Sequence, residues 1–88
     1  MIANRSKLSP TFQSLLRSLT PTFRVGGRLA SLESSEVNNR GKELRIVFHF
    51  TDSFRQYYHT FTSSLSVSEN LNELEKFVAE QAALLTHP

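Results

Sequence analysis

Residues 44–62 read LRIVFHFTDSFRQYYHTFT, and this stretch decides the fold. Apolar and polar side chains alternate through its first half, which predicts a β-strand with one buried face. Asp52 and Ser53 are typical of a turn. The residues that follow are rich in aromatic side chains and threonine, which favour a second strand. The apolar face of the first strand carries Leu44, Ile46, Phe48 and Phe50.

The register of this hairpin should follow from the face that is buried. A two-residue loop, Ser53-Phe54, pairs Phe48 with His59 and gathers nearly all the aromatic side chains on one face. A three-residue loop, residues 53–55, would instead pair His49 with His59. We favour the first register because it buries more apolar area. It places four aromatic residues in the core: Phe48, Phe50, Tyr57 and Phe61.

Two amphipathic helices are predicted to flank the strands. Residues 10–19 form the first, because Ser9 is a good N-cap, Pro10 suits the first helical position and Pro21 ends the helix. The last segment predicts a longer helix that begins at Ser66 or Ser68. Its apolar stripe consists of Leu71, Leu74, Phe77, Val78, Ala82 and Leu85.

The region between the first helix and the hairpin is less regular. Gly26-Gly27 indicates a strand bulge or a close backbone approach, and residues 28–37 an irregular or edge strand. Residues 38–42, NNRGK, are typical of a turn. The expected order is therefore α-β-β-β-α. We expect one α+β domain over residues 9–86, with a three-stranded antiparallel meander and two helices packed on one face, preceded by a flexible basic arm, residues 1–8.

Composition excludes several classes of site. The chain of 88 residues has no cysteine, which rules out disulfides, thiolate metal sites and cysteine nucleophiles. It has no apolar run long enough to span a membrane, and its polar first ten residues lack the apolar region of a secretory signal. We expect an intracellular protein of a reducing compartment, most simply the cytoplasm, that does not associate with membranes.

No motif for catalysis or for a cofactor is present. His49 and His59 could share a metal only in the second register, and they would still lack a third ligand, except for Asp52 at the turn. Gly26-Gly27 matches no phosphate-binding loop. The sequence has no nucleophile elbow and no pair of carboxylates in an apolar setting. We expect no enzymatic activity, no metal and no cofactor.

Charge is unevenly distributed along the chain. Residues 1–32 carry five basic residues and no acidic one, whereas residues 67–88 carry four glutamates and one lysine. Basic residues can neutralise nucleic-acid phosphates, and Tyr57 and Tyr58 could provide stacking surfaces. Alternatively, the two ends of the chain attract each other in the fold. The candidate binding residues are Arg5, Lys7, Arg17, Arg24, Arg28, Arg45 and Arg55.

The expected element order resembles that of double-stranded-RNA-binding domains. Those domains place basic residues at the start of the last helix, where this chain has Ser68-Glu69-Asn70, so the resemblance extends to the order of elements alone. The acid-free residues 1–32, rich in arginine, serine and threonine, also resemble an organelle transit peptide.

The function that these observations favour is a non-enzymatic protein-interaction module: an adaptor, an inhibitor or an accessory subunit. The partner is expected to be a protein, a second copy of the chain included, bound through an edge strand or spare apolar surface. The alternatives are nucleic-acid binding through the basic N-terminal third and an organelle-targeted protein with an N-terminal transit segment.

Overall fold

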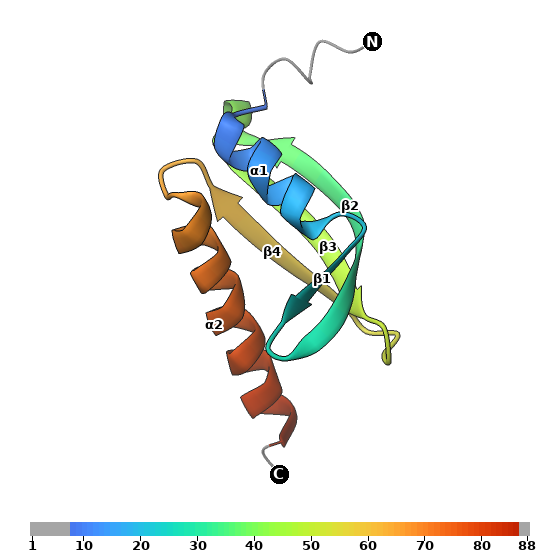
Figure 1. Cartoon of the computed structure of the whole chain (residues 1–88). Coiled ribbons are helices and arrows are strands. Elements are labelled where there is room, and N and C mark those ends of the chain that lie inside the picture. The colour runs from blue at the N-terminus through green and yellow to red at the C-terminus, as the bar shows by residue number, and fades with distance from the viewer. Residues whose placement is uncertain (1–7, 87–88) are drawn as a thin grey trace.

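The computed structural model describes residues 8–86, and the side chains up to Leu84. It is a small α+β fold with two helices and a four-stranded antiparallel sheet in the strand order β1-β2-β3-β4 (Figure 1). The prediction of three strands was wrong by one, and the order of elements is α-β-β-β-β-α. The elements are α1 (Pro10–Leu19), β1 (Thr22–Val25), β2 (Arg28–Asn38), a 3-10 turn (Asn39–Gly41), β3 (Glu43–Phe50), β4 (Gln56–Thr62) and α2 (Val67–Thr86).

The additional strand is β1, and Gly26-Gly27 forms the tight turn that joins it to β2. Val25 pairs with Arg28, so the two glycines are the whole loop. Their φ angles are +61° and +74°, the left-handed conformation that a two-residue hairpin of this hand requires. The expected bulge at these glycines was therefore wrong. The first strand predicted over residues 28–37 is confirmed as β2, and it is irregular as predicted. Its first half lies between β1 and β3, whereas its second half pairs with β3 alone.

A bulge does occur, six residues later, in β2. The pairing of β2 with β3 shifts between Leu32 and Ser34, which leaves Glu33 as the extra residue. A bulge bends its strand, and the first part of β2 carries β1 over the face that the helices cover (Figure 1). The ring of Phe23 in β1 accordingly packs edge-on against Phe48 of β3, with 5.4 Å between centroids.

The β3–β4 hairpin has the predicted face and a different register. Phe48 pairs with Tyr57, not with His59, so the predicted pairing was wrong by two residues. A shift of two preserves the face because side chains alternate with period two. Residues 51–55 lie outside both strands. In this loop the Ser53 N–H donates to the Phe50 carbonyl at 3.0 Å, and Asp52 pairs with Arg28 of β2 at 2.8 Å.

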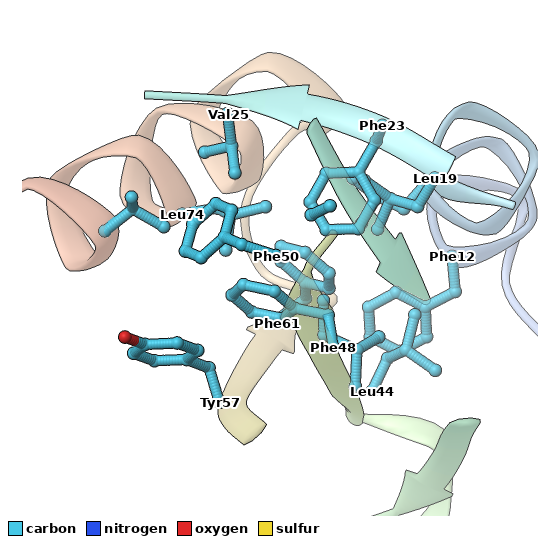
Figure 2. Packing of buried hydrophobic residues seen from close by; sticks show 14 residues of the cluster. Phe12, Leu19, Phe23, Val25, Leu44, Phe48, Phe50, Tyr57, Phe61 and Leu74 are labelled. Carbon is cyan, nitrogen blue, oxygen red and sulfur yellow. The ribbon is translucent and has the colours of Figure 1, made fainter. Parts of the chain in front are cut away.

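The core lies between the sheet and the two helices (Figure 2). All four predicted aromatic residues are buried, and Phe48 and Phe61 are fully so. The rings of Phe48 and Tyr57 stack at 5.6 Å across β3 and β4. The buried apolar residues in the described range are Phe12, Leu15, Leu19, Phe23, Val25, Ala30, Leu44, Ile46, Phe48, Phe50, Tyr57, Phe61, Leu74 and Val78.

The first helix begins and ends as predicted. Ser9 accepts a hydrogen bond from the Phe12 N–H at 3.1 Å, which is the expected N-cap. Six of the fourteen buried apolar residues listed above come from residues 10–32, so this segment is part of the core. Loss of the first 32 residues as a transit segment would remove all six. Of the predicted arm, residues 1–8, only Leu8 lies within the described residues, and it packs against the core.

The long helix α2 contacts both outer strands of the sheet, β4 and β1. Ser66 and Glu69 form a reciprocal capping box at its start, with distances of 2.9 and 3.1 Å. Of the predicted stripe, Leu74 and Val78 are buried and Leu71 and Phe77 are partly buried against the core. Ala82 is exposed. Leu85 lies outside the described side chains.

Among the described residues, the search for a helix long and apolar enough to cross a membrane finds none.

Candidate interaction surface

The edges of a sheet are where a small α+β domain presents unpaired backbone groups. Three stretches of strand lack a neighbouring strand on one side in the described part of this chain: the outer side of β1, the second half of β2 and the outer side of β4. They differ in length, regularity and charge. Those differences decide which of them can accept a partner strand.

The outer edge of β1 is protected. The strand has only four residues, carries the exposed Arg24 and follows Pro21. Short edge strands, charged side chains and proline are recognised ways of preventing edge-to-edge pairing. The turn at the end of the strand is also engaged by α2, since the Gly26 N–H donates to the Glu75 carboxylate at 3.0 Å.

The second half of β2 is protected in a different way. Beyond the bulge, residues 34–38 pair with β3 alone. Glu33, at the bulge, and Glu36, beyond it, are both exposed. Two acidic side chains and a bulge oppose the addition of another strand here.

The outer edge of β4 has none of these protective features. The strand runs for seven residues, QYYHTFT, with neither a charged residue nor a proline. Its pairing with β3 is continuous from Thr62 to Gln56, without a bulge. A long, regular, uncharged edge strand rich in aromatic and β-branched residues is the kind that pairs with another chain.

Asn70 closes this edge at one end only. Its side chain, 1% exposed, accepts the Thr62 N–H at 3.1 Å and donates to the Thr62 carbonyl at 2.9 Å. The amide of Asn70 therefore makes the two bonds that a residue of a neighbouring strand would make. It also donates toward the Leu65 and Ser66 carbonyls, which fixes its orientation.

The position of Asn70 also shows which backbone groups of β4 remain open. Thr62 directs its N–H and C=O away from β3, and this direction alternates along an antiparallel strand. Gln56, Tyr58 and Thr60 therefore direct their backbone groups to the same outer side. All three residues are exposed, and no described segment pairs with them.

The face of β4 that is directed toward the core packs against α2 through His59. Its ring lies 5.0 Å from that of Phe61 and 5.2 Å from that of Phe77. The Nε2 atom of His59 is buried without a hydrogen-bond partner among the described residues. Burial lowers the pKa of His59 below its ordinary value, and the charge of Glu73 opposes this.

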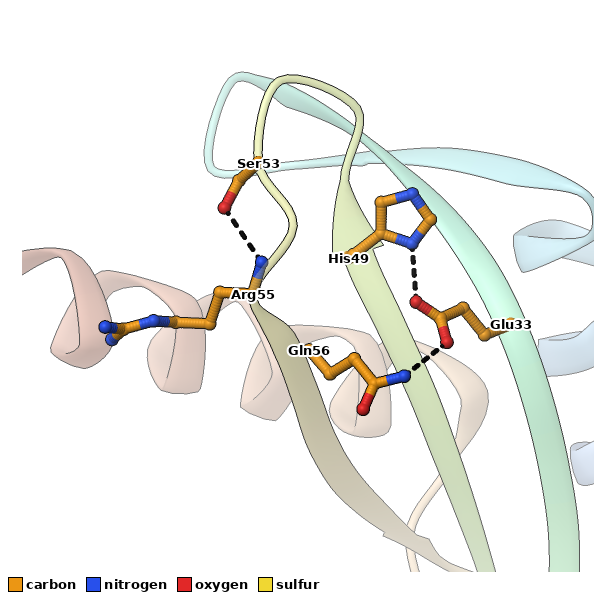
Figure 3. A network of polar contacts seen from close by, with 5 residues as sticks. All are labelled: Glu33, His49, Ser53, Arg55 and Gln56. Carbon is orange, nitrogen blue, oxygen red and sulfur yellow. Dashed lines mark hydrogen bonds and ion pairs between the residues drawn. The ribbon is translucent and has the colours of Figure 1, made fainter.

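The face of the sheet that the helices do not cover, called the open face below, carries a polar network around the bulge (Figure 3). The Glu33 carboxylate reaches His49 Nδ1 of β3 at 2.7 Å and the Gln56 amide of β4 at 2.7 Å. The network thus joins three strands at the point where β2 bends. His49 and His59 lie on opposite faces of the sheet, so they cannot share a metal. The described residues contain no cluster of three or more metal-ligating side chains.

The predicted basic residues are dispersed. Arg17 is exposed on α1, Arg24 on the outer face of β1 and Arg55 in the β3–β4 loop. Arg5 and Lys7 lie outside the described residues. Two others are paired with acidic residues: Arg28 with Asp52 and Arg45 with Glu36, at 2.8 and 3.2 Å.

The predicted stacking pair is divided between the two faces of the sheet. Tyr57 is buried in the core, whereas Tyr58 is 55% exposed on the open face. Sequence reasoning missed the β4 edge, although the absence of charge in QYYHTFT was a usable signal.

A scan against protein-family models finds no match, and searches of the curated proteins and of the solved structures find none either. Function must therefore be inferred from the geometry of the chain itself.

Proposed function

We propose that the protein is a non-enzymatic protein-interaction module that binds its partner by strand addition along β4. The observation that carries this proposal is the contrast between the edges: β1 and the second half of β2 have protective features, whereas β4 is closed only at Thr62, by Asn70. In strand addition, backbone hydrogen bonds supply affinity and alternate side chains supply specificity. At this edge the open backbone groups belong to Gln56, Tyr58 and Thr60.

The side chains beside this edge suit a protein partner. Tyr58 is 55% exposed and Phe54, in the preceding loop, is fully exposed. Exposed aromatic residues are enriched in protein interfaces, where they supply large contact areas. A partner strand on β4 would extend the sheet and cover part of this aromatic surface.

A site-specific cross-link tests the proposal. A photoreactive phenylalanine analogue is placed at Tyr58, and in a matched protein at Leu29, which is 40% exposed on the same face but two strands away from β4. We expect a discrete cross-linked species from position 58 in the source cells and none from position 29. Equal cross-linking from both positions would contradict the proposal.

A proline substitution provides the second arm of this test. Thr60→Pro removes an N–H that points away from β3, so the monomer loses no hydrogen bond of its sheet. We expect it to abolish the cross-link from position 58, whereas Thr60→Ala, which keeps the N–H, should retain it. A cross-link that survives Thr60→Pro would exclude strand addition.

Nucleic-acid binding is the second candidate, and one observation favours it: Arg24, Arg45 and Tyr58 are all exposed on the open face of the sheet. Binding through phosphates weakens steeply with salt. Titrations with duplex RNA, duplex DNA and single strands at roughly 50 and 200 mM salt separate the two candidates. Binding that collapses at the higher salt and is lost when Arg24 and Arg45 become alanine would favour nucleic acid.

A further inference from the structure

We infer that the strand that β4 binds is β4 of a second copy of the chain, paired antiparallel about a two-fold axis at Tyr58. This inference rests on the proposed strand addition and specifies its partner. It is carried by the positions of the open backbone groups and by the chemistry of the strand.

The open backbone groups determine the register. In an antiparallel pair, residues that direct their N–H and C=O toward the partner must stand opposite each other. Centring the pair on Tyr58 places Tyr58 opposite its copy, and Gln56 and Thr60 each opposite the other. All three open residues of both chains are then paired. Any other symmetric register leaves at least one of them without a partner.

The side chains of β4 are compatible with this self-pairing. The strand carries no charge, so no like charges are brought together. Tyr58 meets Tyr58 of the other copy on the open face, and a cross-strand aromatic pair is favourable. Gln56 meets Thr60, which are both polar and exposed. The second half of β2 differs, because pairing with itself would place four carboxylates, Glu33 and Glu36 of each copy, along one short interface.

The ends of the strand limit the length of the pairing. In this register Phe54 would stand opposite Thr62 of the other copy, whose N–H and C=O are already bonded by Asn70, so the ladder is confined to residues 56–60. Phe54 is fully exposed in the single chain.

Sedimentation velocity over a range of protein concentrations is the primary measurement. We expect a reversible dimer for the wild type. Tyr58→Lys and Tyr58→Glu each place like charges opposite each other at the two-fold axis, and each should raise the dissociation constant at least tenfold. Both substitutions are at a side chain that is 55% exposed, so the fold should persist, and circular dichroism checks this.

Mixing the two variants gives the decisive result. An equimolar mixture of Tyr58→Lys and Tyr58→Glu should form a heterodimer, because opposite charges now meet at the axis. Leu29→Lys is the matched control, since it adds the same charge on the same face away from β4, and it should dimerise like the wild type. Recovery in the mixture is not expected from a dimer that uses another surface.

Each other outcome has a definite meaning. A wild type that stays monomeric at all concentrations overturns the self-pairing. If position 58 then still cross-links to a different protein and Thr60→Pro abolishes this, strand addition survives with another partner. A dimer that tolerates both Tyr58 substitutions also overturns the inference, because it must use another surface.

Discussion

The two outer strands of the sheet, β1 and β4, both contact α2, but the hydrogen bonds that the helix makes to them differ. At the β1 side, the exposed Glu75 accepts one hydrogen bond from the Gly26 N–H at the turn. At the β4 side, the buried Asn70 bonds both backbone groups of Thr62. The edge of β1 is closed by its shortness and its charge. The edge of β4 is closed only at Thr62, so its other outward backbone groups are left to bond with water or with a partner strand.

Phe48→Ala should have the largest effect on stability, because this ring packs against residues of both outer strands, β1 and β4. Phe48 is fully buried and contacts the rings of Phe23 in β1 and Tyr57 in β4. Truncation of a buried phenylalanine costs about 3–5 kcal/mol. Chemical denaturation should show a loss of this size or an unfolded protein. A variant with the wild-type midpoint would contradict the core and register described here.

Asn70→Ala should be next, because it removes the closure of β4. The Thr62 N–H would lose its partner, and an unsatisfied buried polar group costs about 1–3 kcal/mol. We expect a loss of about 2 kcal/mol in the free energy of unfolding. The control is Asn72→Ala, an exposed position on the same helix, which should change stability by less than about 0.5 kcal/mol. Similar losses in both variants would mean that Asn70 has no special role.

Gly26→Ala tests the β1 side, with Gly27→Ala as its matched control. Both residues have positive φ, so both substitutions carry a backbone cost of about 1 kcal/mol. A Cβ at Gly26 would lie 3.0 Å from Val78 Cγ1 of α2, whereas a Cβ at Gly27 meets open space. Gly26→Ala should therefore be the more destabilising of the two in thermal unfolding. The reverse order would show that α2 does not pack on this turn.

His59 should give the smallest effect, a dependence of stability on pH. Its pKa in the folded protein is lowered by burial, so the unfolded state, with a histidine pKa of about 6.5, binds more protons. The contribution of His59 is therefore complete above about pH 6.5 and is lost as the pH falls toward the native pKa. His59→Phe should flatten the profile of unfolding free energy over this range.

Glu73→Gln should act on His59 in the opposite direction. The Glu73 charge raises the pKa of His59, so its removal should lower that pKa further and steepen the loss of stability in acid. An unchanged pH profile in both variants would show that another group controls this dependence.

Local signals in the sequence predicted α1 and the buried face of the hairpin. The Ser9 cap, Pro10 and the apolar spacing fix α1, and strict alternation fixes the face of β3. The β3–β4 register could not be predicted in this way, because registers that differ by two residues bury the same face. The four-residue β1 was missed because such a short strand offers little periodicity.

The candidate site was less predictable than the fold. The sequence suggested the basic residues as the binding residues. Which strand forms an edge depends on the order in which the strands pair, and that order is a property of the tertiary structure. Asn70 lies eight residues after Thr62 in a helix, and nothing local shows that its amide pairs with a strand. The uncharged composition of β4 was visible, yet it has meaning only once the strand is known to lie at the edge.

The short, charged β1 also limits how far the sheet can grow. Two copies paired through β4, as proposed, would form one continuous sheet whose outermost strands are both β1. Each of these has only four residues and presents Arg24, so neither offers a template for a third copy. Assembly through β4 in the proposed manner would therefore stop at two copies and would not continue into a fibril.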